Sequence, residues 1–468
     1  MARKLPETEL PKLVPHDGGR IRQTRHYKLI TPLFGGGVEV QQADPISVVR
    51  ASEVRGQLRF WWRATRGGQF GGDWRAMKAA EDLLWGSTEQ QSLVQVSVEV
   101  TERGSDVAPL EVYRAHNGRY RVKFFQQAFQ YALFPLQPPD AELREWDRNP
   151  KPIKVLRKDV AFTLHIIRPQ HWPTSDKPLP FPSSTSPEQE LAAALWAWET
   201  FGGLGGRTRR GFGAILLADQ PLLEIQQLQK WLDELLALHV VDGVWPQNVP
   251  HLNKTRCRLI FQRRNPLSGW NSTDQTHAKL LNDLSDFRQH REPGPTPNQP
   301  GRSHWPEPDS LRLDTRTHMP FHKPRLLMQK YPRAAFGLPI VTHFKDHGDP
   351  GDTTIQGRKR SAEADSGEYD RLGSPLILRP LLCKAAGRDT SVGIALVLDA
   401  PRQPPGGLGI KQGRTITPVA NESLTASDVG AIAALPQNNT KPPLRLENAL
   451  ADDGTVDVLL AFLNYLER

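Results

Sequence analysis

The chain has 468 residues, which leaves room for two or three domains of about 150 residues each. Lysine and arginine number 60 against 51 acidic residues, so the net charge is +9. No stretch approaches the ~18 unbroken apolar residues of a spanning helix, which excludes a membrane span. Glycine (37) and proline (41) are frequent but remain below the proportion typical of disorder, so we expect folded domains with long, irregular loops.

The basic residues are mostly arginine, at 41 Arg against 19 Lys. Arginine presents a planar fork that matches phosphate, so this composition favours a phosphate-bearing partner, although a GC-rich genome also favours arginine. Cys257 and Cys383 are too few for a disulfide framework or a zinc knuckle. The polar N-terminus, Met1 to Arg20, is not a signal peptide. We therefore expect a cytoplasmic protein without a cofactor, a metal or a membrane partner.

The first half predicts two β-α-β units in succession. A helix is expected from the N-cap Ser52 to about Thr65, where Gly67-Gly68 stops it. The other expected elements are strands at Arg25 to Thr31, Leu93 to Thr101, Val160 to Ile167 and Ala214 to Ala218, and helices at Ala76 to Trp85 and Pro187 to Phe201. Residues 1–24 are expected to form an arm, and 134–152 and 169–187 to be loops. This order is the split βαβ of a ferredoxin-like fold.

The second half predicts a less regular repeat of the same pattern. Its expected elements are strands at Arg258 to Gln262, Ser374 to Cys383 and Ser391 to Leu398, and helices at Asp274 to Arg288 and Val456 to Leu466. Residues 292–308 and 345–370 are rich in proline, glycine and charge and are expected to be mobile. We predict an α+β chain of tandem ferredoxin-like (RRM-like) domains, 1–250 and 251–468, with long irregular insertions.

The helix after Ser52 carries a basic face. At about 100° per residue, four arginines fall within an arc of roughly 80°. They are Arg55, Arg59, Arg63 and Arg66. Like charges on one face repel each other, and a bound anion would relieve this. The alternative is a solvated face that pairs with Glu53, Glu81 or Asp82. Trp61 and Trp62 are expected to be core residues, although Trp62 could stack on a base.

The segment Gly202 to Gly213 holds six glycines around three arginines and a threonine. Glycines allow positive φ, and successive free N–H groups can form an anion-binding concavity. The segment fits neither a P-loop nor a dinucleotide fingerprint, and its alternative reading is a long flexible turn. We expect the loop to be exposed, so that replacing its three arginines should cost little stability. A second glycine-rich turn, Gly406 to Lys411, has Lys411 and Arg414 as its basic residues, and it either contacts phosphate or is a plain surface turn after Pro404-Pro405.

Several motifs resemble the RAMP proteins of CRISPR systems, a superfamily of RNA-binding proteins. They are Thr31-Pro32-Leu33-Phe34-Gly35-Gly36-Gly37, the block Arg50 to Ala64, Trp85-Gly86-Ser87, Arg210-Gly211-Phe212-Gly213, Phe336 to Ile340 and Ser374 to Arg379. The chain is most similar to RAMP subunits of type III-B effector complexes. The block after Arg50 and the glycine segment are specific, and the matches in the second half are weaker.

The resemblance implies a non-catalytic subunit of an antiviral ribonucleoprotein, with guide RNA, target RNA and other RAMP subunits as its partners. It implies a place near the 3′ part of the guide. The expected RNA-binding residues are Arg50, Arg55, Arg59, Arg63, Arg66, Gly205, Gly206, Arg207, Thr208, Arg209, Arg210, Lys411 and Arg414. Long polar insertions between 262 and 370 depart from the family pattern and leave their own role open.

Some RAMP relatives cut RNA, so an endoribonuclease is the alternative function, and a general phosphate-ligand module is a weaker one. The alternative catalytic residues are Asp44, in the loop after the first strand, and His26 on that strand. An aspartate before proline usually forms a turn. The pairs His318/His322 and His343/His347 have helical spacing, but nearby proline and glycine make a metal-binding helix improbable. We expect no catalytic residue and no metal ligand.

Overall fold

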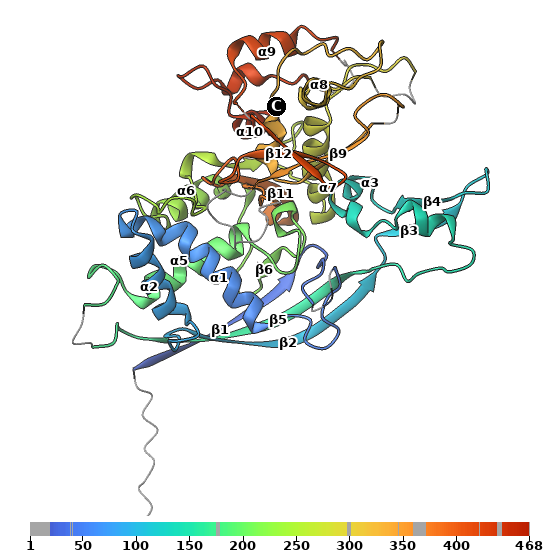
Figure 1. The fold of residues 1–468 in the computed structure, drawn as a ribbon. Helices are drawn as coiled ribbons and strands as arrows, with labels where there is room; N and C mark the ends of the chain where they lie inside the picture. The colour runs from blue at the N-terminus through green and yellow to red at the C-terminus, as the bar shows by residue number, and fades with distance from the viewer. Residues whose placement is uncertain are drawn as a thin grey trace, which may run out of the picture.

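The computed structural model describes residues 19–467 except 38, 40, 175–177, 297–300, 345, 359–370, 421 and 438–441. The expected N-terminal arm therefore lies outside the described residues up to residue 18, as do parts of the two segments expected to be mobile. The fold is mixed helix and antiparallel sheet, which confirms the predicted α+β class. Figure 1 shows the first half below the second.

A four-stranded antiparallel sheet organises the first half. Its strands are β1 (Arg20–Leu29), β2 (Gln95–Val107), β5 (Leu156–Pro169) and β6 (Ile215–Leu217), in the spatial order β2-β5-β1-β6. Its helices are α1 (Ala51–Arg66) and α2 (Trp74–Trp85) after β1, and α5 (Pro187–Phe201) after β5. The elements thus follow one another as β, α, β, β, α, β, and α1 and α5 cover one face of the sheet (Figure 1).

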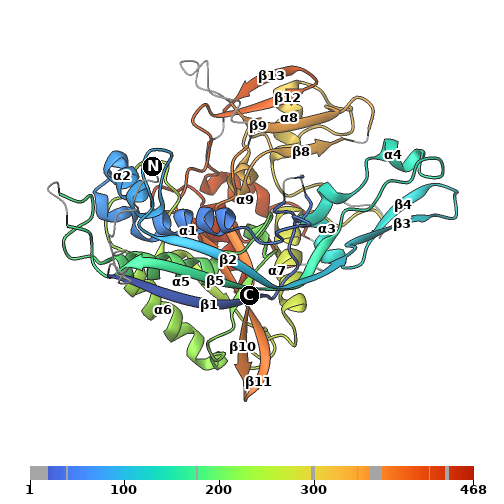
Figure 2. The same ribbon diagram turned by 90° about the horizontal axis from the view of Figure 1, so that it is seen from below.

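The segment of the chain that connects β2 to β5 forms an arm that projects from the first half (Figure 2). It consists of the hairpin β3 (Leu110–Arg114) and β4 (Tyr120–Phe124) with helices α3 (Gln127–Leu133) and α4 (Asp140–Arg144). From the sequence we predict only a loop over 134–152, and no hairpin. Helix α6 (Leu228–His239), also not expected, leads to the second half.

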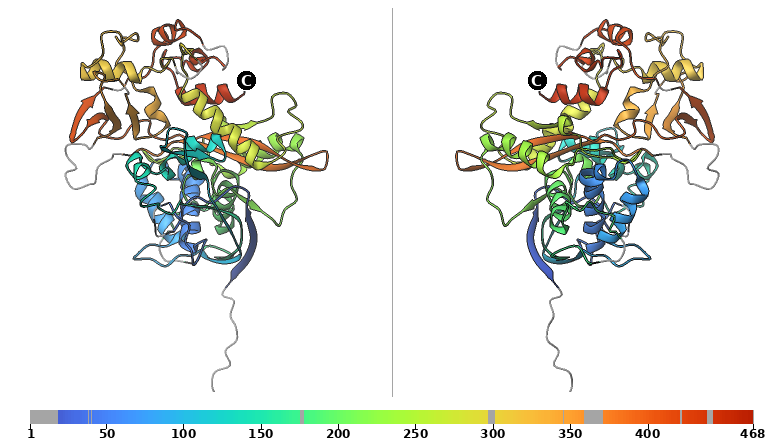
Figure 3. Two further views of the ribbon diagram at one scale, coloured as in Figure 1. Left: turned by 90° about the vertical axis from the view of Figure 1, so that its right-hand side faces the viewer. Right: turned by 90° about the vertical axis from the view of Figure 1, so that its left-hand side faces the viewer.

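The second half has a three-stranded sheet in the order β10-β11-β7. Its elements are β7 (Cys257–Ile260), α7 (Thr273–Arg288), β10 (Leu376–Ala385), β11 (Arg388–Val397) and α10 (Val458–Leu466). Within the described part of the chain no fourth strand joins this sheet, so the repeat of the first half is incomplete. The β10–β11 hairpin extends from the body (Figure 3).

A separate four-stranded sheet is inserted into the second half, in the order β13-β12-β9-β8. Its strands are β8 (Ile340–His343), β9 (Asp352–Gly357), β12 (Leu408–Gln412) and β13 (Thr415–Val419), and α8 (Glu307–Thr315) and α9 (Ala426–Ala433) lie beside it in the chain. Short 3-10 helices occupy Gly67–Phe70, Phe134–Leu136, Thr208–Arg210, Ile225–Gln227, Lys254–Arg256, Pro332–Phe336 and Leu446–Ala449. Segment 292–308, expected to be a mobile loop, instead holds the buried Trp305 and the start of α8.

One apolar core joins the two halves. Trp61, Trp62 and Trp198 belong to the same cluster of buried residues as Ile377 and Ile394 of the second sheet. Both tryptophans of α1 are almost fully buried, at 2% and 0% exposed, so the prediction of core roles is confirmed and Trp62 is not available for stacking on a base.

Candidate nucleic-acid interface

The glycine segment after α5 is a compact loop rather than an exposed turn. The amide of Gly213 donates to the carbonyl of Pro32 at 2.8 Å, and the amide of Leu204 donates to the carbonyl of Gly213 at 2.9 Å. Gly213 has φ +64, and a Cβ there would lie 2.0 Å from the Leu204 oxygen, so only glycine fits. The prediction of an exposed loop is therefore wrong.

The amides of Gly205 and Gly206, two of the loop's candidate anion-binding groups, are already occupied. The amide of Gly205 donates to the Glu53 carboxylate of α1, and the amide of Gly206 donates to the carbonyl of Phe34 at 2.6 Å. Burial raises the pKa of Glu53, and the bond from Gly205 and the charge of Arg50 oppose this. An internal carboxylate thus occupies a position that we predict from the sequence for a bound anion.

The three arginines of the loop have different surroundings. The Arg209 guanidinium donates to the carbonyl of Ser374, and Arg210 donates to the carbonyl of Leu376 at 2.8 Å, so both tie the loop to the start of β10. Burial lowers the pKa of Arg210 to about 9. Arg207 lies over the ring of Phe134 at 5.6 Å and makes no such cross-link.

A cavity of about 810 Å³ opens beside Arg207, between the loop, α3, α7 and the segment before β8. We call it the arginine cleft. Its arginines are Arg207, Arg210, Arg288, Arg333 and Arg371. Tyr131, Phe134 and Phe336 supply aromatic surface, and none of the described lining residues is an aspartate or a glutamate.

Most of this positive charge meets no carboxylate among the residues that the structure describes. Arg333 is paired with Glu307 at 2.9 Å. Arg288 donates to the hydroxyl of Tyr131 at 2.5 Å, and its buried Nε has no hydrogen-bond partner. Within the described ranges no carboxylate lies in ion-pair contact with Arg207, Arg288 or Arg371. Guanidinium groups next to aromatic rings suit the phosphates and bases of a single-stranded nucleic acid.

The basic face of α1 is largely paired, as the alternative interpretation states. Arg59 and Arg63 share the carboxylate of Glu81, at 2.7 and 2.6 Å. Arg59 also lies 3.5 Å from Asp82. The helix therefore neutralises two of its four arginines against α2.

Arg66, Arg50 and Arg55 differ from these two. Arg66 is buried and pairs with the fully buried Glu190 at 2.8 Å, and Glu190 also accepts from the indole of Trp62 at 2.7 Å. Arg50 donates to the carbonyl of Gly36 at 2.6 Å. Arg55 is exposed. A structural role thus accounts for Arg66, and Arg55 is the member of this face that is free for an external anion.

The remaining candidates lie away from the cleft. Lys411 is on β12 and Arg414 is in the turn to β13; both are exposed, and neither lines the cleft. The Asp44 carboxylate accepts from the amides of Ile46 and Ser47, at 2.8 and 2.7 Å, and these bonds lower its pKa. His26 is exposed on β1, and its ring lies 3.2 Å from the Thr163 hydroxyl. The Asp44 geometry is that of a turn-forming aspartate.

The residue-by-residue prediction misses Arg288, Arg333 and Arg371 as well as the three aromatic residues of the cleft. A signal for the cleft was nevertheless present. Phe336 to Ile340 and Ser374 belong to motifs on which the family resemblance rests, and both line the cleft together with Arg210. Motifs far apart in the sequence thus converge on one cavity.

A search of the described helices for a span of membrane-crossing length and hydropathy finds none.

Comparison with known proteins gives one family. Residues 26–215 match the family model of the RAMP superfamily. The chain is 29% identical to the CRISPR system Cmr subunit Cmr1-2 of Pyrococcus furiosus over 210 residues, covering 43% of this chain and 94% of the relative. It is 40% identical over 179 residues to subunit Cmr1-1 of the same organism, covering 38% of this chain and 43% of the relative.

Two solved structures align with most of the chain at low identity and low TM-score. The apo crystal structure of Cmr1 from Pyrococcus furiosus aligns over 82% of this chain and 90% of that chain, with 16% identity and a TM-score of 0.42. A chain of the type III-B Cmr-beta complex bound to cognate target RNA aligns over 83% of this chain and 97% of that chain, with 13% identity and a TM-score of 0.44.

Proposed function

We propose that this chain, whose residues 26–215 match the family model of the RAMP superfamily, is a subunit of a type III-B CRISPR effector, similar to Cmr1, and that it binds RNA without cutting it. In this role it contacts guide RNA and target RNA and assembles with other RAMP subunits. The arginine cleft is the observation that supports RNA binding, because two of its arginines, Arg207 and Arg288, lie over aromatic rings and its described lining residues include no acid.

The cleft predicts binding through phosphate and base stacking rather than through base-edge reading. Guanidinium contacts to phosphate carry little sequence information. For single strands the slope of log K against log salt is about −0.7 for each neutralised phosphate. We therefore expect affinity to depend strongly on salt and weakly on sequence.

Fluorescence anisotropy with a labelled single-stranded RNA tests this proposal. The double variant Arg207→Gln/Arg371→Gln should bind at least about tenfold more weakly, with a salt slope about 1.4 shallower, because two phosphate contacts are lost. The matched control Lys411→Gln/Arg414→Gln removes the same charge outside the cleft and should retain the affinity. Equal losses in both double variants would contradict a site in the cleft.

The non-catalytic role is tested at Asp44. Its carboxylate accepts two amide bonds in its own turn, and one such group is a poor cage for the divalent ion that a metal-dependent nuclease needs. Asp44→Ala should leave target cleavage by the assembled complex unchanged in a gel assay with end-labelled RNA. Loss of one specific cut, with normal assembly, would instead favour the endoribonuclease alternative.

A further inference from the structure

Three metal-binding side chains meet outside the arginine cleft. His322 follows α8, and Asp346 and Asp349 lie in the turn between β8 and β9. One donor atom of each lies within 4.8 Å of the other two. We call these three residues the His322 cluster. Loops far apart in the sequence supply its two parts.

The distances in the cluster are those of ligands around a single ion. Nδ1 of His322 lies 3.1 Å from a carboxylate oxygen of Asp349 and 3.7 Å from one of Asp346. Ligands bound at about 2.1 Å lie about 3.0–3.5 Å apart when the angle at the ion is between 90° and 109°. The donor oxygens of the two carboxylates lie within 4.8 Å of each other, and the Asp346 side chain is exposed, so it can turn toward the other two donors.

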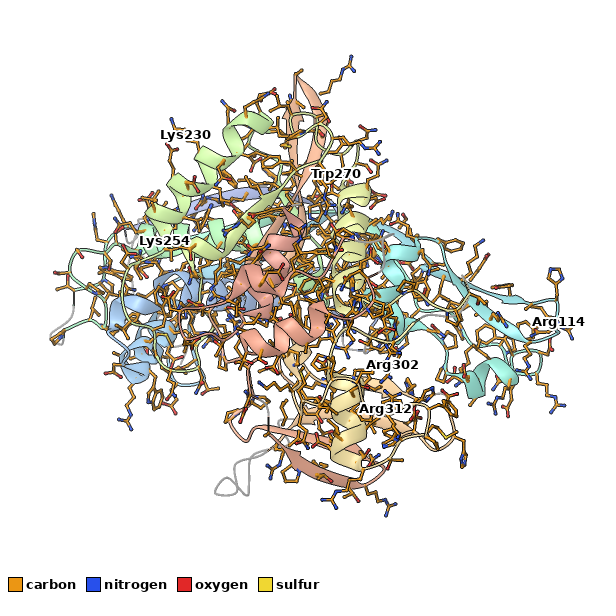
Figure 4. The ribbon with its side chains drawn as sticks, turned by 90° about the horizontal axis from the view of Figure 1, so that it is seen from above. Arg114, Lys230, Lys254, Trp270, Arg302 and Arg312 are labelled. Carbon is orange, nitrogen blue, oxygen red and sulfur yellow. The ribbon has the colours of Figure 1, made fainter. Side chains whose placement is uncertain are left out.

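One of the ligands is fixed before any ion binds. The Asp349 side chain is 3% exposed, and its Oδ2, the oxygen that faces His322, also accepts from the Arg312 guanidinium at 2.8 Å. The same carboxylate accepts from the amide of Met319 at 3.2 Å. Figure 4 labels Arg312 on α8. Hydrogen bonds of this kind orient a ligating carboxylate and tune the ion that it holds.

The donor set selects the class of ion. One imidazole nitrogen with two carboxylate oxygens suits divalent transition metals such as Zn²⁺, Co²⁺ and Mn²⁺ better than Mg²⁺ or Ca²⁺, which prefer oxygen alone. The exposure of Asp346 leaves a path for the ion and room for water as a further ligand. We propose that the His322 cluster binds one divalent transition-metal ion, held by His322, Asp346 and Asp349.

Such an ion would stabilise one wall of the arginine cleft. Strand β8 ends at His343, three residues before Asp346, and Ile340, Val341 and His343 line the cleft. The ion joins the turn after β8 to the loop after α8, so it limits the movement of this strand. None of the three ligands lines the cleft itself. Metal binding can therefore be measured independently of RNA.

Calorimetric titration of the purified full chain, freed of metal with a chelator, tests the proposal with Zn²⁺ as the probe. We expect one saturable site per chain. Asp346→Asn and His322→Gln should each weaken it by about tenfold or more, since each removes a direct ligand. Co²⁺ in the same site should give visible absorption that both variants lose. Asp349 is left unchanged because the buried Arg312 depends on it.

His343→Gln is the matched control. His343 is exposed in the same region and pairs with Asp352 at 2.8 Å, outside the cluster. This variant should keep the wild-type affinity. If His322→Gln does not fold, as judged by circular dichroism, the exposed Asp346→Asn carries the test. Unchanged Zn²⁺ affinity in the folded ligand variants, an equal loss in His343→Gln, or no saturable site in the wild type would overturn the proposal.

Discussion

His277 on α7 shows how a single buried side chain supports the glycine loop. Its Nε2–H donates to the carbonyl of Arg210 at 2.6 Å, and its ring lies against Phe129 and Phe212. Burial lowers the pKa of His277 to about 4. The imidazole is therefore neutral at physiological pH, and protonating it in the folded state is unfavourable.

Acidification should consequently destabilise the protein through His277. Below pH 6.5 the unfolded chain binds a proton that the folded chain does not, so the free energy of unfolding falls between pH 6.5 and about 4. Between pH 7 and pH 5 we expect a loss of about 2 kcal/mol from this residue. Urea denaturation at both pH values should show a smaller difference in His277→Gln than in the wild type.

His239 does not affect the difference in pH dependence between the wild type and His277→Gln. Burial also lowers its pKa to about 4, so it titrates in the same direction. It is present in both proteins, however, and its effect cancels in the difference. Identical pH dependence in wild type and His277→Gln would refute the assignment.

Arg66 is the clearest case of an arginine that sequence assigns to RNA and structure assigns to the core. It pairs with the fully buried Glu190, and removing one partner of a buried pair leaves the other charge uncompensated. Arg66→Met should lower the free energy of unfolding by about 3–5 kcal/mol.

The exposed Arg55 on the same helix provides the control for Arg66. Arg55→Met should change stability little, as surface substitutions usually do. Chemical denaturation of both variants provides the measurement. Equal stabilities would show that the Arg66–Glu190 pair contributes nothing.

At the scale of elements, the glycine loop acts as a connector between sheets. Arg209 and Arg210 donate to carbonyls at the start of β10. Hydrogen bonds from charged groups contribute about 1.5–3 kcal/mol. Arg210→Ala should therefore lower the melting temperature, contrary to the expectation that the loop arginines can be removed without cost.

Arg207→Gly is the companion variant. Arg207 has φ +59, a conformation that glycine adopts freely, and it has no bond to β10. Differential scanning fluorimetry should find its melting temperature close to that of the wild type. A lower melting temperature in Arg207→Gly than in Arg210→Ala would contradict these roles.

Local signals explain which elements the sequence predicts well. Helix α5 has the predicted bounds because Ser186 and Gln189 form a capping box, Pro187 occupies the first turn and Gly202 follows the last. Helix α8 was not predicted, because the sequence at its start, around Pro306 and Glu307, resembles the surrounding proline-rich loop. The strands and helices around α1 were predicted with small shifts of their bounds. For example, β1 begins at Arg20 instead of Arg25.

Contacts between residues distant in the chain could not be predicted from the sequence. The face of α1 was correctly identified as basic, but its neutralisation depends on Glu81 of α2, whose orientation follows from packing. The arginine cleft depends on bringing Arg207 next to Arg288 and Arg371. Only tertiary structure decides such neighbours, so the residues were visible but the site was not.

At the scale of the whole molecule, Arg379 joins the two halves. It lies on β10, is 1% exposed, and donates to the carbonyls of Glu199, Gly202 and Ile215 at 2.8, 2.8 and 2.7 Å. We still propose that the chain divides into two domains near residue 250, each built around its own sheet. The shared core and this side chain argue that the halves are not independent in stability.

Arg379→Met should therefore destabilise the whole chain. Two buried carbonyls of the first half, those of Gly202 and Ile215, lose their partner, at about 1–3 kcal/mol for each group left unsatisfied. Lys384→Met, farther along the same strand, should have little effect, because Lys384 is only half-buried and Arg379 is fully buried. Urea unfolding followed by tryptophan fluorescence compares the two. Equal stabilities would show that the halves cohere without Arg379.

The shared core also affects how the protein is made. A ribosome completes α5 long before it reaches β10, and at roughly 5–20 residues per second the interval lasts on the order of ten to thirty seconds. During that time the apolar seam around Trp198 lacks the strand that covers it in the finished molecule. The newly made first half therefore waits in an incomplete state, exposed to aggregation, and its survival depends on how quickly translation delivers residues 376–397.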